Sequence, residues 1–261
     1  MTSRSENWPS YVINMAENTT RMENVSNQMA EQNIAFVRVN AVDGRKFDEA
    51  ETSKVYDAAA NKKYGKYPLV GPEIGCYLSH INAWRTIAEG DAEGGFIFED
   101  DFQSDQYLKT VLTALSNDER DWDMVKLFAF NPAVPLANGR ELTPDHIIGI
   151  PYRVPTCLIG YGVTKLAAQS LVKRADQARF FRPVDEDQKF VWETGLRVAL
   201  VARPPIQIGD QTAQSGTVSN ARRGLAHNGI SAKIRKALHV FWYAFRYNYH
   251  LHKYKRKGRR S

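Results

Sequence analysis

The segment from Gly94 to Phe102, GGFIFEDDF, constrains the fold more than any other part of the chain. Its paired glycines and three apolar residues are typical of a short buried strand, which runs directly into Glu99, Asp100 and Asp101. Ligands of α/β folds bind at the carboxyl ends of strands. Burying any of three adjacent carboxylates is costly unless a cation or hydrogen-bond donors compensate. The segment therefore predicts an α/β protein with its active site at this strand end.

The rest of the chain alternates between strand and helix patterns. Apolar strand patterns are found at 10–15, 35–39, 124–129, 155–163 and 197–202. Pro72 opens a helix that stops at Gly90, with apolar residues every three or four positions. We expect residues 45–70 to be irregular and residues 130–150 to form a surface loop. The alternation predicts one α/β domain with a mostly parallel, Rossmann-type sheet flanked by helices.

Composition limits the setting in which the chain works. Apolar residues make up 43% of the 261 positions, which is ample for a core. The sequence has no uncharged apolar stretch of about 18 residues, and its amino terminus lacks the apolar centre of a secretory signal. Cys76 and Cys157 are too few for a disulfide framework or a thiolate metal site. We therefore expect a reduced, cytoplasmic location.

Charge is distributed unevenly along the chain. The last 51 residues contain 12 of the 35 basic residues and no acidic residue, since the last acid is Asp210. Residues 1–210 hold the other 23 basic residues and all 29 acidic ones, an excess of six negative charges. An acidic body followed by a cationic tail predicts two segments, a catalytic domain over 1–220 and a basic, aromatic C-terminal helical extension over 221–261.

A second acidic cluster follows Pro183, at Asp185, Glu186 and Asp187. Acids in the first turn of a helix are favoured by the helix dipole, so helix capping explains this cluster on spacing alone. If the fold brings it near Asp101, one of its acids becomes a candidate general base for a hydroxyl nucleophile.

Polar residues elsewhere allow two interpretations each. His80 lies on the expected 72–90 helix, where a histidine is usually a hydrogen-bonded structural residue. A Ser–His–Asp hydrolase is not favoured, because the chain has no G-x-S-x-G elbow. Asn14 and Arg21 flank the first strand and its helix. Each is either a cap or surface charge, or a group that reaches a nucleotide at the sheet edge.

The order of the motifs resembles glycosyltransferase family 25, which includes bacterial lipooligosaccharide galactosyltransferases and collagen galactosyltransferases. The resemblance spans residues 10–217 and rests on YVIN, Arg21, AVDG, EIGCYLSHINAW, FIFEDD, DMVKL, GYGVTKLAAQSL and PVDED. It implies a GT-A-like fold, a nucleotide-diphosphate-sugar donor and inversion at the anomeric carbon.

The resemblance also implies roles for individual residues. Donor-side positions would be Asn14, Arg21, Asp43 and Gly44. Glu99 and Asp101 would take the metal-binding part of a D-x-D motif, and Asp185 matches the Pro-Val-Asp of the family. The family favours galactose from UDP as the donor, and a glycan or lipid-linked glycan such as lipooligosaccharide as the acceptor.

The chemistry of such a transfer agrees with the residue types. A divalent Mn²⁺ or Mg²⁺ ion held by Asp101 would neutralise the charge of the departing diphosphate. Inversion is a single displacement, so the acceptor hydroxyl needs a base. We expect Asp185 or Asp187 to be that base, with Asp100 and His80 as weaker alternatives. The rival interpretations are a metal-dependent phosphoryl or nucleotidyl transferase that uses the same acids, and a basic nucleic-acid-binding protein.

The basic tail carries a helical pattern of its own. Its apolar residues recur every three or four positions: Ile230, Ile234, Leu238, Phe241, Phe245 and Tyr249. One interpretation is a helix docked on the body. The other is an interfacial anchor whose aromatic groups enter the headgroup region while its cations attract anionic lipid. The second makes the protein peripheral on the cytoplasmic face of a membrane, whereas nucleic acid is not favoured because no recognised binding motif is present.

Overall fold

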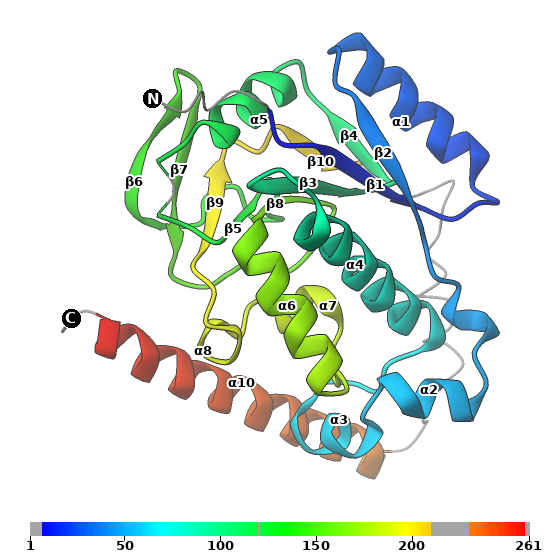
Figure 1. Cartoon of the computed structure of the whole chain (residues 1–261). Helices are drawn as coiled ribbons and strands as arrows, with labels where there is room; N and C mark the ends of the chain where they lie inside the picture. The colour runs from blue at the N-terminus through cyan, green and yellow to red at the C-terminus, as the bar shows by residue number, and fades with distance from the viewer. Residues whose placement is uncertain (1–6, 120, 210–229, 259–261) are drawn as a thin grey trace.

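The computed structural model describes residues 7–119, 121–209 and 230–258, excluding the side chains of 230–236 and 257–258. Its centre is an eight-stranded sheet of order β2-β1-β3-β8-β5-β9-β7-β6 (Figure 1). The strands are β1 Ser10–Asn14, β2 Phe36–Asn40, β3 Gly94–Glu99, β5 Met124–Lys126, β6 Leu136–Thr143, β7 His146–Pro151, β8 Gly160–Thr164 and β9 Val198–Ala202. A separate pair joins β4 Phe102–Ser104 to β10 Ile206–Ile208.

Strand direction brings the expected site residues together at the carboxyl ends of neighbouring strands. Pairings β1·β2, β1·β3 and β5·β9 are parallel, whereas β8 and β7 run against their neighbours. The sheet is therefore mixed, with most strands pointing one way, as the sequence predicted. Asn14 pairs with Asn40, and Ile13 pairs with Glu99, so β1, β2 and β3 end together.

Helices cover both faces of the sheet (Figure 1). They are α1 Thr19–Glu31, α2 Glu49–Val55, α3 Ala58–Tyr64, α4 Gly71–Glu89, α5 Leu108–Ser116, α6 Lys165–Gln177, α7 Val184–Asp187, α8 Val191–Thr194 and α10 Ile230–Gly258, with the 3₁₀ turn η1 at Gly44–Lys46. In β3, Phe96 and Phe98 face the cluster under α1 and α5, whereas Ile97 faces the cluster under α4 and α6. All three side chains are fully buried, so β3 is the central strand that its apolar run predicted.

A contact between two backbones joins η1 to the start of α4. A methyl group on Gly44 would lie 2.0 Å from the carbonyl oxygen of Gly71, and one on Gly75 would lie 2.3 Å from that of Val42. Only glycine allows this approach. The EIGC motif therefore has a packing role, since it holds η1 and its N-cap Asp43 against the helix.

Two sequence-based expectations were wrong in detail. Residues 130–150 are not a surface loop throughout, because β6 and β7 form an antiparallel hairpin at the sheet edge. Most of β6 is exposed, so the sequence carries little apolar alternation there. Residues 45–70 contain η1, α2 and α3 instead of irregular chain, and both helices begin with an aspartate cap, Asp48 and Asp57.

Helix α10 docks on the body near α3 and α8 (Figure 1). Among the described residues, no helix has the length and apolar character that a membrane span requires. The expected domain boundary at 220/221 lies outside the described residues, as do the side chains of Ile230 and Ile234.

Candidate active site

Asp100 is held by groups from the first strand and helix. Its carboxylate accepts bonds from Asn14 Nδ2 at 2.6 Å and from Arg21 Nη1 at 2.8 Å. Arg38 Nε in turn donates to Asn14 Oδ1 at 2.9 Å. Two of the expected donor-side residues therefore meet Asp100, which is buried and well supplied with donors.

Asp101, the next residue, lacks such partners. Its Oδ1 is buried and has no hydrogen-bond partner among the described residues. Desolvation, followed by the negative charge of Glu99, raises the pKa of Asp101 to about 7. A carboxylate oxygen that is sealed from water and left unpaired is a ready ligand for a cation. Two carboxylates, Glu99 and Asp101, offer the oxygen donors that Mg²⁺ and Mn²⁺ take, so the site fits a divalent ion.

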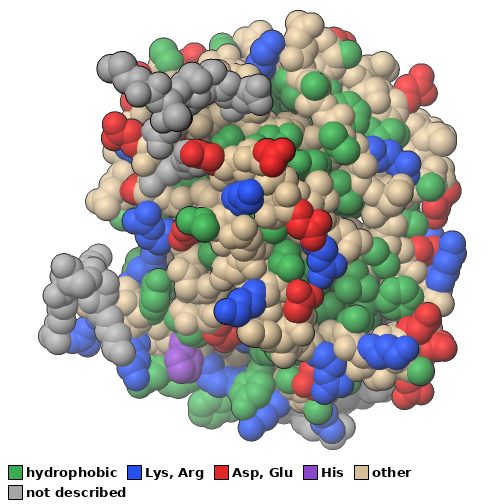
Figure 2. Space-filling view, viewed as in Figure 1, with side chains coloured by type: hydrophobic (Ala, Val, Ile, Leu, Met, Phe, Trp, Pro, Cys, Tyr) green, Lys and Arg blue, Asp and Glu red, His purple; other side chains and the backbone are tan. Residues whose placement is uncertain are grey.

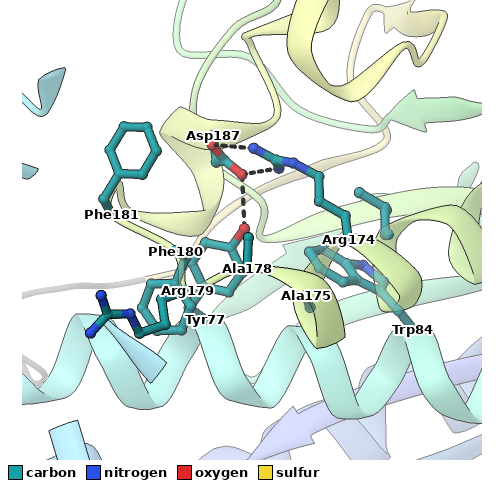
Figure 3. A pocket seen from close by; sticks show the side chains of 10 residues that line it. Tyr77, Trp84, Arg174, Ala175, Ala178, Arg179, Phe180, Phe181 and Asp187 are labelled. Carbon is teal, nitrogen blue, oxygen red and sulfur yellow. Dashed lines mark hydrogen bonds and ion pairs between the residues drawn. The ribbon is translucent and has the colours of Figure 1, made fainter. Parts of the chain in front are cut away.

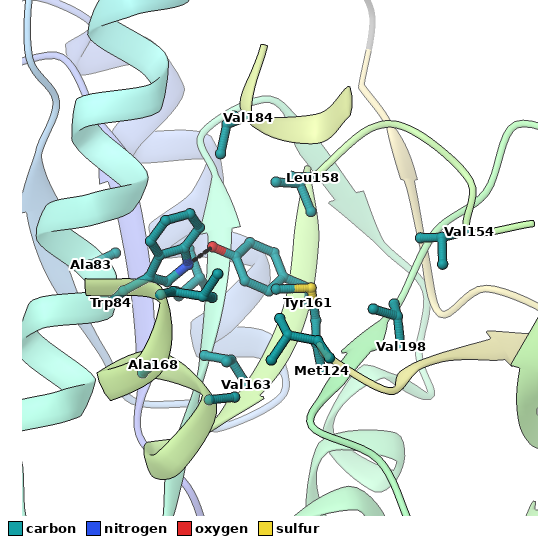
Figure 4. Packing of buried hydrophobic residues seen from close by; sticks show 14 of the residues in the cluster. Ala83, Trp84, Met124, Val154, Leu158, Tyr161, Val163, Ala168, Val184 and Val198 are labelled. Carbon is teal, nitrogen blue, oxygen red and sulfur yellow. Dashed lines mark hydrogen bonds between the residues drawn. The ribbon is translucent and has the colours of Figure 1, made fainter. Parts of the chain in front are cut away.

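Glu99 is oriented by a buried chain of side chains. Trp84 Nε1 donates to the Tyr161 hydroxyl at 2.7 Å (Figure 4). That hydroxyl lies 2.9 Å from His80 Nδ1, and His80 Nε2 lies 3.2 Å from Glu99 Oε1. Because the Glu99 carboxylate can only accept, a neutral His80 carries its proton on Nε2, and Nδ1 then accepts from the Tyr161 hydroxyl. His80, which is fully buried, thus has both ring nitrogens engaged.

Cys76 lies near several of the candidate acids. The ligand atoms of Cys76, His80 and Glu99 lie within 4.8 Å of one another. Burial raises the pKa of the Cys76 thiol, and the charges of Glu99, Asp185 and Asp101 raise it further, in that order. The charges of all three carboxylates therefore reach the Cys76 thiol, and Glu99 also lies beside it. The raised pKa keeps the thiol protonated as long as no cation lies beside it.

Asp185 lies at the start of α7, and its charge acts on the Cys76 thiol. Its Oδ2 accepts a bond from the backbone N–H of Cys157 at 3.1 Å. Cys157 has φ of 73°, a left-handed conformation that costs energy for a residue with a side chain. Buried Lys126, at the end of β5, donates to the carbonyls of Pro155 and Thr156 at 2.6 and 3.1 Å and so fixes this turn. Burial lowers the pKa of Lys126 to about 8.

Asp187, two residues further on, is fully paired (Figure 3). It accepts bonds from Tyr77 at 2.8 Å and from Arg182 at 2.9 Å, and it also pairs with Arg174. Both Asp187 and Arg182 are buried. The small cavity beside this network, about 70 Å³, is lined by Trp84, Phe180 and Phe181 among others.

Asp43 lies at a separate feature, an open groove beyond the ends of β1 and β2. The groove has a volume of about 540 Å³, and its lining includes Met15, Asn40, Asp43 and Phe47. The hydrogen bond from the side chain of Arg45 lowers the pKa of Asp43 to about 2. Met15 directly follows Asn14, so the groove adjoins the Asp100 cluster.

Sequence reasoning missed Arg38 and Lys126. Both were visible as single cations inside otherwise apolar strand patterns, FVRVN and DMVKL. Lys126 lies in a buried strand and must find acceptors, which it does at the end of β5. Arg38 is exposed on the edge strand β2 and reaches the site through Asn14.

Comparisons with known proteins point to one family. The model of glycosyltransferase family 25 (LPS biosynthesis protein) matches residues 7–134. Procollagen galactosyltransferase 1 of Danio rerio is 25% identical over 184 residues, covering 67% of this chain and 30% of that protein. Procollagen galactosyltransferase 1-A of Xenopus laevis is 30% identical over 189 residues, with the same coverage of 67% and 30%. The chain thus spans under a third of the length of these relatives.

Two further matches complete the comparison. An inactive glycosyltransferase 25 family member 3 of Mus musculus is 23% identical over 220 residues, covering 74% of this chain and 35% of that protein. Among solved structures, the inositol-1-phosphate CTP transferase from T. maritima aligns with a TM-score of 0.43 and 12% identity, covering 85% of this chain and 99% of that one. The family model and the matched relatives agree: the chain belongs to glycosyltransferase family 25.

Proposed function

We propose that the chain is an inverting, metal-dependent glycosyltransferase that moves galactose from UDP-galactose to a hydroxyl of a glycan acceptor. The galactosyltransferase names of the relatives support the donor sugar. The observation that carries the proposal is the buried Oδ1 of Asp101, which has no hydrogen-bond partner among the described residues and follows Glu99 and Asp100 at the end of β3. Carboxylates whose oxygens all had hydrogen-bond partners would serve structure alone. Here the Asp101 Oδ1 remains available to a ligand.

The donor would lie along the edge formed by β1, β2 and β3. The open groove next to Met15 and Asp43 has room for a nucleoside. Glu99 and Asp101 would hold Mn²⁺ or Mg²⁺ beside the diphosphate. When bound, such an ion neutralises the negative charge that develops on the departing UDP. Arg21 and Asn14 hold Asp100 in place and so shape this edge.

Asp185 is our choice for the base that takes the acceptor proton. It lies at the start of α7 beside Cys157, and its charge, like those of Glu99 and Asp101, acts on the Cys76 thiol. Asp187 and Asp100 are committed to cations and amide donors. His80 Nδ1 and Nε2 are both occupied, so His80 orients Glu99 and does not take the proton. The backbone N–H of Cys157 fixes the Asp185 carboxylate.

The experiment is a UDP-release assay with UDP-galactose, with and without a glycan acceptor panel, in EDTA and after addition of Mn²⁺. We expect metal-dependent release that rises with acceptor and falls by about a thousandfold in Asp101→Asn, because a metal ion contributes several kcal/mol to transition-state stabilisation. Asp91→Asn, an exposed aspartate away from the site, is the matched control. Full activity of Asp101→Asn, or of wild type in EDTA, contradicts the metal assignment. Turnover of the nucleotide that no sugar acceptor stimulates would favour a phosphoryl or nucleotidyl transferase instead.

A further inference from the structure

Among the described side chains of helix α10, one face is buried against the body. The buried side chains of this face are Tyr243, Tyr247 and Leu251, spaced four residues apart. The Tyr247 ring lies 5.3 Å from the rings of both Phe190 and Trp192, measured between centroids. These contacts fix the helix by its packing face, so its other face has a defined direction.

That other face carries a continuous apolar stripe. It consists of Leu238, Phe241, Trp242, Phe245 and Tyr249, each 53–61% exposed. At 100° per residue these positions lie opposite the docked face. The Trp242 ring lies 5.9 Å from Phe241 and 5.7 Å from Phe245, so the rings form one surface. Folded chains rarely leave such a stripe in water without a binding role.

Cations surround the stripe. Exposed Lys253 and Arg256 follow it on the next turns of α10. On its flank lies α3 with exposed Lys62 and Lys63, because Arg246 donates to the Lys63 carbonyl at 3.0 Å. His239 Nε2 lies 2.7 Å from the Gly65 carbonyl and ties the same segment to the helix. Along the lower edge of Figure 2, hydrophobic side chains lie among Lys and Arg side chains.

We infer that this face of α10, with the lysines of α3, binds the surface of an anionic lipid bilayer. A bilayer offers both components that the face requires, an apolar layer for the rings and anionic headgroups for the cations. A second copy of the chain is disfavoured, because residues 211–261 contain no acid to meet the cations of a facing α10. Nucleic acid would match the cations but leave a convex aliphatic and aromatic stripe largely in water.

The inference is independent of the proposed activity, since it concerns a surface formed by α10 and α3. The test is co-sedimentation of the full chain with vesicles of phosphatidylcholine alone, and with vesicles in which about a third of the lipid is phosphatidylglycerol. We expect binding to the anionic vesicles that weakens as salt rises, because the headgroup attraction is screened. Brominated lipid should quench the fluorescence of Trp242, the tryptophan of the stripe.

Variants distinguish lipid binding by the stripe from non-specific binding by other exposed apolar residues. The triple change Phe241→Ala, Trp242→Ala and Phe245→Ala should lower the partition constant by roughly tenfold or more, since it removes the inserted rings. The matched control replaces three exposed apolar residues elsewhere, Val37→Ala, Phe130→Ala and Leu166→Ala, and should bind as wild type. Lys253→Gln with Arg256→Gln should weaken binding and flatten its salt dependence.

Several results would overturn the inference. Equal binding of both triple variants, or no binding of wild type to anionic vesicles, would show that the stripe is not a lipid site. Sedimentation velocity that reports a dimer lost in the first triple variant would assign the face to self-association. Tight oligonucleotide binding lost in that variant would assign it to nucleic acid. None of these measurements depends on turnover, so failure of the lipid-binding inference is distinct from failure of the glycosyltransferase proposal.

Discussion

Asp101 and Asp187 are both shielded carboxylates, yet the protein treats them in opposite ways. Asp187 receives Arg174, Arg182 and the hydroxyl of Tyr77. Asp101 keeps one buried oxygen without a partner among the described residues, and its pKa rises to about 7. A buried carboxylate with a full set of partners ties segments of the fold together. A buried carboxylate without partners destabilises the fold as long as no ligand supplies them. The difference separates the acid that serves structure from the acid that is available to a ligand.

The largest expected effect distinguishes the two aspartates of α7. Asp185→Asn should lower kcat by roughly 10²- to 10⁴-fold, the usual contribution of a general base. Donor affinity and unfolding free energy should stay near wild type, as measured by UDP titration and urea unfolding. The exposed Asp176→Asn serves as a control. Loss of UDP binding in Asp185→Asn would move this acid from the acceptor side to the nucleotide.

The next effect concerns stability. Asp187→Asn removes the buried counter-charge of Arg174 and Arg182 and leaves them only Glu193, so unfolding free energy should fall by up to about 3–5 kcal/mol. The control is again Asp176→Asn, which breaks an exposed pair with Arg85 and should cost under about 1 kcal/mol. Urea unfolding followed by circular dichroism measures both. Equal losses in the two variants would mean that the Asp187 network is not the structural element described above.

The pH dependence of stability tests Asp101 directly. Its folded pKa is raised from 3.8 to about 7, so between these two pH values the folded state binds more protons than the unfolded state. Unfolding free energy in EDTA should therefore decline as pH rises through this window, with a slope of at most roughly 1.4 kcal/mol for each pH unit. Asp101→Asn should flatten the decline, whereas Asp91→Asn should keep it. Superimposable profiles for wild type and Asp101→Asn would contradict the raised pKa.

The smallest expected effect concerns the turn that holds Asp185. Lys126→Met leaves the carbonyls of Pro155 and Thr156 without their donor, which should cost about 1–3 kcal/mol of stability. The Cys157 N–H should then shift, and kcat should fall by roughly tenfold with KM little changed. Lys165→Met removes a similar bond, to the Gly90 carbonyl, far from these acids and should leave kcat unchanged. A rate loss shared by both variants would make the Lys126 effect one of general stability.

Much of the fold could be predicted from the sequence, because its signals are local. The three apolar residues before Glu99 specified the central strand, and Pro72 with Gly90 marked the ends of the long helix. The hairpin of β6 and β7 could not be predicted, since β6 is mostly exposed and its pairing with β7 is a tertiary property.

The candidate site was predictable only in part. Consecutive carboxylates at a strand end indicated where chemistry would be placed. Which acid receives which cation depends on packing between distant segments, however. Arg174 reaches Asp187 from α6, and Arg21 reaches Asp100 from α1. No spacing rule in the sequence distinguishes Asp185 from Asp187, although the structure gives them entirely different surroundings.

The contact between Gly44 and Gly71 has a consequence for how donor preference could change. The side of the groove formed by Asp43 rests on backbone touching backbone, and a single methyl group at Gly44 would collide with the Gly71 carbonyl. Its position therefore cannot be adjusted by exchanging larger for smaller side chains. If the donor binds in this groove as proposed, variation in the nucleotide or sugar accepted must come from side chains that line the groove, such as Lys46 and Phe47. A library for altered donor choice is best confined to those positions, with the glycines held fixed.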